Sequence, residues 1–386
     1  MKILITTDTY TPTVNGVVFS VLLLKQELER LGHEVRVATL SKSHHSHREG
    51  EVYYLASLGA GKVYPDARVA VHKTRRFVEE LLAWAPDVIH SQQEFSSFRL
   101  AHYLSKKGNI PIVHTYHTAY EDYTHYFSPS VRVGKKAVSL FTRKISGSVS
   151  CLIAPTRKIK VMLEGYGIHC PVEVIPTGVD LDAFGGSCDP AWKERTLAGL
   201  DIPRDRRVLV YLGRMAKEKG IDQLMDLLAQ SGREDFVLLA VGDGPYKPKL
   251  EERAKDLPYL VVFTGAVPHE KIRDYYQLGD LFVTASTSET QGLTYFEALA
   301  SGVPVLCRRD ECVDGVIVDG VNGWQYDTPE EFRAALDTFC GQSGLPETLS
   351  QNARSTAERY SARAFGRAAE ALYRRVAGQK IPAGVS

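Results

Sequence analysis

Two glutamates eight positions apart, Glu289 and Glu297, stand on either side of a Gly-Leu-Thr stretch that leads into an Ala-rich helical run. If the whole interval were helical, the two backbones would lie ~12 Å apart along the helix axis. The carboxyl groups of a glycoside hydrolase lie closer, at ~5–9.5 Å. We therefore expect Glu289 in the loop before the helix and Glu297 about one turn inside it. There the two carboxylates would flank a ligand and accept hydrogen bonds from its hydroxyls.

The ligand expected between them carries a diphosphate. Arg214 and Lys219 lie in a turn after a predicted strand, and an arginine fork and a lysine point charge suit such a group. Gly292 opens the next helix, so the backbone amides of Leu293 and Thr294 would face an anion at the positive end of the helix dipole. A diphosphate between two sets of hydroxyls describes a nucleotide sugar.

The elements that must position these groups alternate between strands and helices. Runs such as "KILITTD", "EVRVATL" and "DVIHSQ" alternate with helical stretches such as "VVFSVLLLKQELERLG". After a segment rich in Gly, Pro and Asp, the pattern restarts with "RVLVYLGR" and "FVLLAVGDG". This predicts an α/β protein with two parallel sheets. Ligands of such sheets bind beyond the carboxyl ends of the strands, where the residues named above lie.

The composition is that of an ordinary globular protein. The sequence argues against a membrane-spanning helix, a signal peptide and a cysteine metal cage. Of the 386 residues, 44% are hydrophobic and 24% charged. No stretch approaches about 18 uninterrupted apolar residues, and the first residues lack the apolar centre of a signal peptide. Six cysteines without a CxxC pair argue for reduced thiols in the cytoplasm and against a metal cage. No DxD-type cluster follows a strand, so we expect no metal, and we expect no nucleic-acid partner.

The motifs resemble those of the family 4 retaining glycosyltransferases. Glu289 and Glu297 match that family's Glu-x7-Glu signature. Four further motifs stand in the family's order across nearly the whole chain: "NGV" (15–17), "GRMAKEKG" (213–220), "VGDGP" (241–245) and "TGAV" (264–267). The resemblance implies the GT-B architecture, in which two Rossmann-like domains with parallel sheets face a central cleft.

Three parts of the chain follow from that architecture. Residues 1–185 would form the N-terminal, acceptor-side domain, and residues 186–365 would form the C-terminal domain that binds the nucleotide sugar. Residues 366–386 would be a C-terminal helix and tail that return to the first domain.

The resemblance also implies a role for each motif residue. Arg214 and Lys219 would neutralise the diphosphate, Glu289 would bind sugar hydroxyls, and Glu297 would bind the ribose. His117 would lie beside the reacting centre and complete the catalytic set. The remaining donor-binding residues are Gly16 on the first domain, Gly213, Val267 (whose backbone would read the base), Gly292, Leu293 and Thr294. No cofactor is implied; the co-substrate would be a nucleotide sugar, expected to be UDP-glucose.

The acceptor is indicated by the block "YHTAYEDYTHY", which looks like the corresponding part of bacterial 1,2-diacylglycerol 3-glucosyltransferases. We therefore expect transfer of a hexose, with glucose as the expected sugar, to a diacylglycerol-type lipid. The residues expected on the acceptor side are Tyr120, Glu121, Asp122 and Tyr126.

A basic segment soon after this block favours an anionic partner. Residues 130–160 contain no acid and eight basic residues: Arg132, Lys135, Lys136, Arg143, Lys144, Arg157, Lys158 and Lys160. Helical spacing puts one set of side chains on an apolar face: Val131, Val138, Phe141 and Ile145. We expect this helix to lie on the anionic inner face of the cell membrane and hold the protein there peripherally. The expected membrane contacts are Arg132, Lys135, Lys136, Phe141, Arg143 and Lys144.

Other interpretations stay open at this point. The apolar face of the basic helix could pack on the core, and Gly134 weakens the helix prediction. The same fold could serve a soluble sugar or organic-acid acceptor, a nucleotide-sugar epimerase, or a sensor that binds the donor without reaction. A lipid acceptor predicts sedimentation with anionic vesicles, which a soluble acceptor does not.

Overall fold

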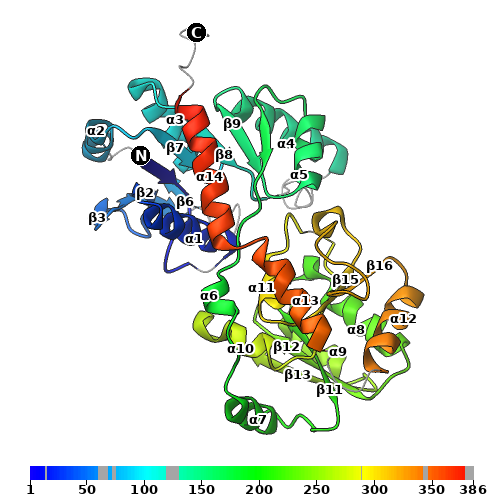
Figure 1. Ribbon diagram of the computed structural model, residues 1–386. Helices are drawn as coiled ribbons and strands as arrows, with labels where there is room; N and C mark the ends of the chain where they lie inside the picture. Colours follow the sequence, from blue (N-terminus) through cyan, green and yellow to red (C-terminus); the bar gives the residue numbers. More distant parts are fainter. Residues whose placement is uncertain are drawn as a thin grey trace. The chain divides into compact units, whose positions relative to one another are not determined.

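The computed structural model describes residues 1–13, 15–59, 68–71, 75–118, 130–287, 289–341 and 347–378, without the side chains of Val131 and His269. The chain forms two compact units (Figure 1). Unit 1 comprises Met1–Gly178 and Ala362–Ser386, and unit 2 comprises Val179–Ser361. These divisions fall close to the predicted limits of 185 and 365. The predicted tail after residue 378 lies outside the described residues.

Unit 1 is built on an eight-stranded sheet in the order β10-β9-β8-β7-β1-β2-β4-β3, parallel except for the β3–β4 pair. Its strands are β1 (Lys2–Thr6), β2 (Glu34–Leu40), β3 (His47–Glu49), β4 (Val52–Leu55), β7 (Val88–Ser91), β8 (Ile112–Thr115), β9 (Cys151–Ala154) and β10 (Val172–Val174). A separate two-stranded sheet pairs β5 (Ser57–Gly59) with β6 (Arg68–Ala70). The sequence predicted the parallel arrangement of the main sheet.

The two faces of this sheet follow from the alternation of side chains along each strand. Ile3 and Ile5 of β1 pack in the core beneath α1 and α14, while Leu4 packs on the opposite face with α2 and α3. The C-terminal helix thus lies beside the first helix of the chain (Figure 1). The helices of unit 1 are α1 (Gly16–Arg30), α2 (Arg75–Trp84), α3 (Ser96–Gly108), α4 (Val131–Ser146), α5 (Arg157–Gly165) and α14 (Ala362–Ala377).

Unit 2 has a six-stranded, fully parallel sheet in the order β13-β12-β11-β14-β15-β16. Its strands are β11 (Arg207–Leu212), β12 (Phe236–Val241), β13 (Leu260–Gly265), β14 (Leu281–Thr284), β15 (Val305–Arg308) and β16 (Gly323–Tyr326). Near-continuous burial of β11, β12 and β14 is what a parallel sheet covered on both faces requires. The order reverses between β11 and β14, so the loops that follow these two strands leave the sheet side by side.

Helices cover both faces of this second sheet. Side chains of α10, α11 and α13 share one apolar core, and those of α8, α9 and α12 share the other. The α-helices of unit 2 are α6 (Leu181–Phe184), α7 (Pro190–Gly199), α8 (Ile221–Gln230), α9 (Lys247–Ala254), α10 (Ile272–Tyr276), α11 (Leu293–Ala300), α12 (Pro329–Cys340) and α13 (Glu347–Glu358), and its short 3-10 helices are η2 (Lys217–Lys219), η3 (His269–Lys271) and η4 (Glu311–Val313). Phe184 of α6 is buried in the core that α10, α11 and α13 share, which explains why the segment around it belongs to unit 2.

Candidate functional site

The loops after β11 and β14 bring Lys219 and Glu289 into contact. The Lys219 ammonium donates to Glu289 Oε1 at 2.6 Å, and the hydroxyl of Ser286 donates to the same oxygen at 2.7 Å. Both residues of the ion pair are less than a quarter exposed, so solvent screens the pair only in part. Two groups, one on each loop, thus hold the Glu289 carboxylate at the carboxyl end of the sheet.

Arg214 follows β11 and is held differently from Lys219. Its guanidinium forms an ion pair with Glu218, and its side chain is 53% exposed. The hydroxyl of Tyr211 donates to the backbone carbonyl of Arg214 at 3.3 Å. Arg214 and Lys219 therefore lie on the same loop, and each has a carboxylate partner within unit 2.

Glu297 lies in a more buried environment than Glu289. It is the fifth residue of α11, about one turn inside the helix, whereas Glu289 precedes the helix, as the spacing predicted. The hydroxyl of Tyr276 on α10 donates to Glu297 Oε2 at 2.8 Å. Glu297 is only 9% exposed, and burial raises its pKa to about 7 despite that hydrogen bond. The two glutamates of the signature thus differ in burial and in partner.

Helix α11 begins at Leu293, directly after Gly292, as the sequence predicted. Gly292 caps the helix in the left-handed conformation with φ 74°, and a Cβ there would come within 2.5 Å of the Tyr295 ring. Leu293 and Thr294 are the first two helical residues and are half-buried. Their amides belong to the turn that lacks intrahelical acceptors. The helix therefore presents backbone donors beside the loop that carries Glu289.

Two further residues predicted to bind the donor follow β11 and β13, the strands on either side of β12. Gly213 directly follows β11, and its carbonyl oxygen is so close to Gly242 that a Cβ on Gly242 would lie 2.0 Å from it. Gly242, the first glycine of "VGDGP", thus lets the loop after β12 pack against the loop after β11. Val267 follows β13, is half-buried and packs against the core shared by α10 and α11.

In unit 1, the polar residues Asp8, Gln92 and His117 follow the carboxyl ends of three neighbouring strands, β1, β7 and β8. The Nε2 of His117 lies 2.7 Å from Gln92 Oε1, and burial lowers the pKa of His117 to about 4, so the ring is neutral near pH 7. Asp8, which follows β1, accepts a hydrogen bond from the backbone amide of Ser97 at 2.7 Å, and burial raises its pKa to about 6. Gly16 is the exposed first residue of α1.

The predicted acceptor-side residues lie outside the described residues: Tyr120, Glu121, Asp122 and Tyr126. His117 is therefore the last described site residue before that block.

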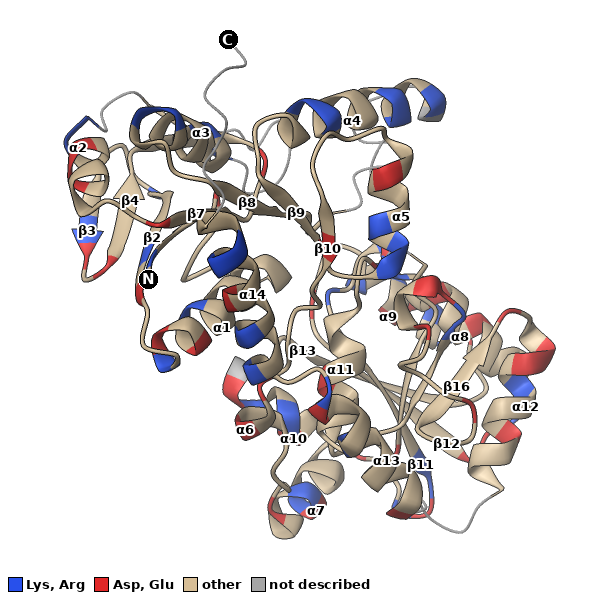
Figure 2. Cartoon of the chain, turned by 45° about the horizontal axis from the view of Figure 1, so that its top comes forward, with Lys and Arg blue, Asp and Glu red and all other residues tan. Residues whose placement is uncertain are grey.

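Helix α4 carries the basic residues predicted to contact a membrane, and Figure 2 shows them along the helix. All six predicted contacts are exposed: Arg132, Lys135, Lys136, Phe141, Arg143 and Lys144. Val138 and Ile145 are buried, so the alternative in which the apolar side packs inward holds for these two residues. It fails for Phe141, which is 39% exposed and stacks on Phe95 with 6.1 Å between ring centroids. Gly134 lies inside the helix and is buried.

Several partners in these sites were missed by sequence reasoning. Glu218 stands inside the "GRMAKEKG" motif, so its charge could have been paired with Arg214. Tyr276 and Gln92 had no such signal, because their partners come from other elements. Ser286 lies three residues before its partner Glu289 on the same loop, so it could have been considered. In the described part of the chain, no group of three or more His, Cys, Asp or Glu side chains could hold a metal ion. No helix among the described residues is long and apolar enough to cross a membrane.

Comparison with protein families gives two matches in chain order. A model described as "Glycosyltransferase Family 4" matches residues 14–183, and one described as "Glycosyl transferases group 1" matches residues 193–356. The chain is 33% identical to an alpha-monoglucosyldiacylglycerol synthase of Streptococcus pneumoniae, over 87% of this chain and 77% of the relative. It is 32% identical to a protein of the same name from Acholeplasma laidlawii, over 97% of this chain and 96% of the relative.

Solved structures share the fold at lower identity. HepE of Anabaena, in complex with UDP, superposes with a TM-score of 0.73 at 19% identity, covering 96% of this chain and 99% of that one. Sucrose-phosphate synthase of Thermosynechococcus elongatus gives a TM-score of 0.74 at 19% identity, covering 97% and 98%. Together with the two parallel sheets, these likenesses assign the GT-B fold.

Proposed function

The chain belongs to the family 4 glycosyltransferases, and from that premise we propose that it transfers a hexose from a nucleotide-diphosphate sugar to a diacylglycerol-type membrane lipid. The observation that carries the lipid acceptor is the likeness to two alpha-monoglucosyldiacylglycerol synthases over most of the length of this chain and of both relatives. Their name makes glucose the proposed sugar. UDP-glucose is the proposed donor, and HepE of Anabaena, which has the same fold, was solved with that compound.

In this proposal the two signature glutamates hold different parts of the donor. Glu289 precedes α11 and is joined to Lys219, so its carboxylate accepts hydrogen bonds from sugar hydroxyls close to the diphosphate. Glu297 lies deeper, beside Tyr276, and takes the ribose. The amides of Leu293 and Thr294 bind the phosphate between them, where the helix dipole favours negative charge.

Cleavage of the anomeric bond leaves negative charge on the nucleotide diphosphate. Arg214 and Lys219 meet that charge, and fixed positive groups that act on charge formed in the transition state accelerate such a step. The same role could be filled by a metal ion in another transferase, and we propose that here the two side chains fill it alone. Removal of Arg214 should then lower kcat by about 10²–10³.

We further propose retention of configuration at the anomeric carbon. The acceptor hydroxyl would attack from the face that the diphosphate leaves, and its proton would pass to the leaving phosphate oxygen. No side chain is needed as the base. His117, neutral near pH 7 because of its lowered pKa, would contribute a hydrogen bond beside the reacting centre instead of a charge.

The lipid acceptor requires the protein to meet a membrane, and α4 is the proposed contact. Its six exposed contact residues combine five positive charges with Phe141. Each Lys or Arg near an anionic surface contributes ~1 kcal/mol of attraction. The protein would then lie peripherally on the cytoplasmic leaflet.

A screen of donors against acceptors tests the proposal. UDP-glucose, UDP-galactose and UDP-N-acetylglucosamine are each offered with diacylglycerol in mixed micelles and with soluble sugars and organic acids. We expect glucosylation of diacylglycerol, an α-linked product by NMR, and undiminished activity in EDTA. Transfer to soluble acceptors alone would favour the soluble-acceptor alternative, and donor binding without transfer or hydrolysis would favour a sensor. A strict need for a divalent cation would contradict the role given to Arg214 and Lys219.

A further inference from the structure

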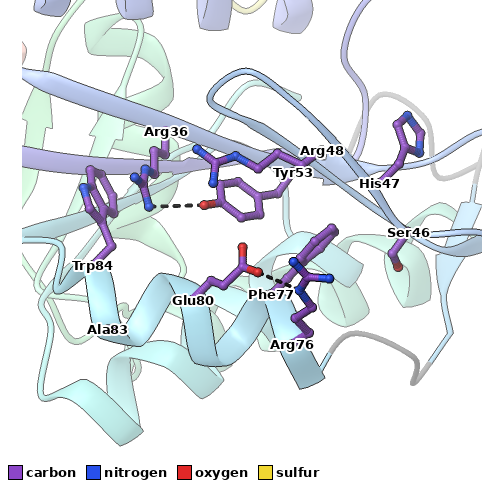
Figure 3. A pocket seen from close by; sticks show the side chains of 10 residues that line it. All are labelled: Arg36, Ser46, His47, Arg48, Tyr53, Arg76, Phe77, Glu80, Ala83 and Trp84. Atoms are coloured by element: carbon purple, nitrogen blue, oxygen red, sulfur yellow. Dashed lines mark hydrogen bonds and ion pairs between the residues drawn. The ribbon is translucent and has the colours of Figure 1, made fainter.

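A pocket of about 620 Å³ lies in unit 1 between the sheet and α2 (Figure 3). Arg36 of β2 and Tyr53 of β4 line its sheet side, together with Arg48 of β3. Arg76 and Trp84 of α2 line the other side. The volume is within the ~300–1,000 Å³ typical of sites for small organic ligands.

Arginine is the commonest charged residue that lines this pocket. Three arginines line it, and Glu80 is the one carboxylate among the lining residues. Arg36 and Arg48 share a single carboxylate, that of Glu51, at 2.7 Å and 3.0 Å. Arg76 pairs with Glu80 at 2.8 Å. The three guanidinium groups thus share the carboxylates of Glu51 and Glu80. A further carboxylate, that of Glu34, accepts a hydrogen bond from Trp84 Nε1 at 3.3 Å.

Arg36 is held in an apolar setting that keeps its charge near the pocket. Its guanidinium lies 4.4 Å from the ring centroid of Trp84, and its Nη1 donates to the hydroxyl of Tyr53 at 3.1 Å. Arg48 lies 4.8 Å over the ring of Tyr53, and that ring makes an edge contact with Phe77 at 5.2 Å. Guanidinium planes stacked on aromatic rings are preorganised for the forked recognition of a phosphate, which a lysine would not provide. The rings add apolar walls for an organic part.

The pocket lies away from the strand ends that carry the candidate site. Arg36 is the third residue of β2 and pairs in register with Leu4 of β1, whereas Asp8 and Gln92 lie beyond the carboxyl ends of β1 and β7. Tyr53 is likewise only the second residue of β4. Neither the donor nor the acceptor of the proposed reaction therefore accounts for these arginines.

We propose that this pocket binds a small organic phosphate, its phosphate held by Arg48 and Arg76 and its organic part lying against Phe77 and Trp84. This inference is independent of the proposed reaction. The same chemistry is offered by a soluble phosphate ester and by the headgroup of a phospholipid.

Isothermal titration of the full chain with glycerol 3-phosphate tests the site, with saturating UDP present so that the donor loops are occupied. Replacement of both exposed arginines, Arg48→Gln with Arg76→Gln, should weaken binding at least tenfold. Glu80→Gln releases Arg76 from its partner and should tighten binding about threefold, since an exposed ion pair of this kind is weak. A gain in affinity cannot result from misfolding.

The chain offers a matched control on the same helix. Arg75 pairs with Glu79 at 2.8 Å, the same spacing and distance as Arg76 and Glu80, but neither residue lines the pocket. Arg75→Gln and Glu79→Gln should leave the affinity unchanged. If they change it as much as the pocket variants do, binding reflects general surface charge and the proposal is wrong.

Two further probes separate the sources of the ligand. Monomeric dihexanoyl phosphatidylglycerol, kept below its micelle concentration, is compared with glycerol 3-phosphate and with inorganic phosphate. A site for a lipid headgroup should bind dihexanoyl phosphatidylglycerol more tightly than glycerol 3-phosphate. A site for soluble esters should bind glycerol 3-phosphate at least as tightly as the lipid. Either result supports an organic phosphate as the ligand. If inorganic phosphate binds as tightly as the two organic phosphates, the role proposed for the aromatic walls is wrong. Absence of binding by all three probes at about 10 mM would overturn the site.

Discussion

At the scale of single residues, Glu289 and Glu297 carry the same carboxyl group in different surroundings. The Glu289 carboxylate accepts from a lysine and a serine on the loops, where its negative charge is matched. That of Glu297 accepts from Tyr276 inside unit 2, and burial raises its pKa to about 7. A carboxyl group with such a pKa gains or loses its proton near physiological pH.

Alanine variants should separate the proposed roles of the two glutamates. Glu297→Ala should mainly weaken binding of the free nucleotide, because it removes the ribose contact. Glu289→Ala should lower kcat while UDP still binds, since the contact it loses is to the transferred sugar; it also frees Lys219. Calorimetric binding of UDP and steady-state kinetics measure the two effects. Equal losses of UDP affinity in both variants would contradict the division.

Nucleotide affinity should depend on pH through Glu297. The ribose hydroxyls are best accepted by the ionised carboxylate, so a proton must leave when nucleotide binds below the pKa of about 7. Affinity should therefore be highest above pH 7 and should fall toward about tenfold per pH unit well below it. Tyr276→Phe removes a donor to the carboxylate and should move this midpoint to higher pH, whereas Tyr275→Phe, on the same helix, should not.

UDP titrations between pH 5.5 and 8.5 measure this midpoint. Glu297→Gln is the control, because the phosphate of UDP itself titrates near pH 6. If Glu297→Gln keeps the midpoint of the parent protein, the dependence belongs to the nucleotide and the prediction is wrong.

At the scale of elements, the start of α11 depends on one glycine. Gly292 has φ 74° and would bring a Cβ within 2.5 Å of the Tyr295 ring, whereas Gly315 has φ 69° with no atom within 4 Å of its Cβ position. Gly315→Ala should cost only the ~1–2 kcal/mol of a left-handed backbone. Gly292→Ala should lower the melting temperature further and weaken UDP binding, because the helix start must shift. Equal melting temperatures for the two variants would show that the ring moves aside freely.

Helix α4 shows how packing divides one amphipathic pattern. Of the apolar face that helical spacing predicted, Val138 and Ile145 turn to the interior. Phe141 stays outside and stacks on Phe95 at the start of α3. The exposed side of α4 therefore combines aromatic and basic groups, which suits an interface between headgroups and acyl chains.

At the scale of the whole molecule, membrane attachment should follow the charge of α4. Reversal of Arg132, Lys136 and Arg143 to glutamate should abolish sedimentation with anionic vesicles and lipid glycosylation, while background hydrolysis of the donor continues. The attraction should also weaken with salt, since the Debye length falls to ~3 Å at 1 M. The same three reversals at exposed arginines elsewhere, Arg75, Arg195 and Arg333, provide a control of equal charge. Undiminished vesicle binding by the α4 variant would make this helix an ordinary solvated surface.

Local sequence was sufficient for the elements and for the order of the site residues. Strand and helix periods are set within a few residues, so the two α/β units, the position of Glu289 before α11 and that of Glu297 inside it could all be predicted. The glycines of the motifs could also be interpreted from the sequence. A positive φ angle or a close approach of two backbone segments leaves few other residue types possible at such positions.

Tertiary structure alone decided which side chains became partners. Tyr276 meets Glu297 because α10 and α11 cover the same face of the sheet, and Lys219 meets Glu289 because β11 and β14 are neighbours. The pocket beside Arg36 exists because β2, β4 and α2 converge, although nothing in their separate sequences links them. Strand order and helix packing are determined by contacts distant in the chain, and a local pattern of residues does not contain that information.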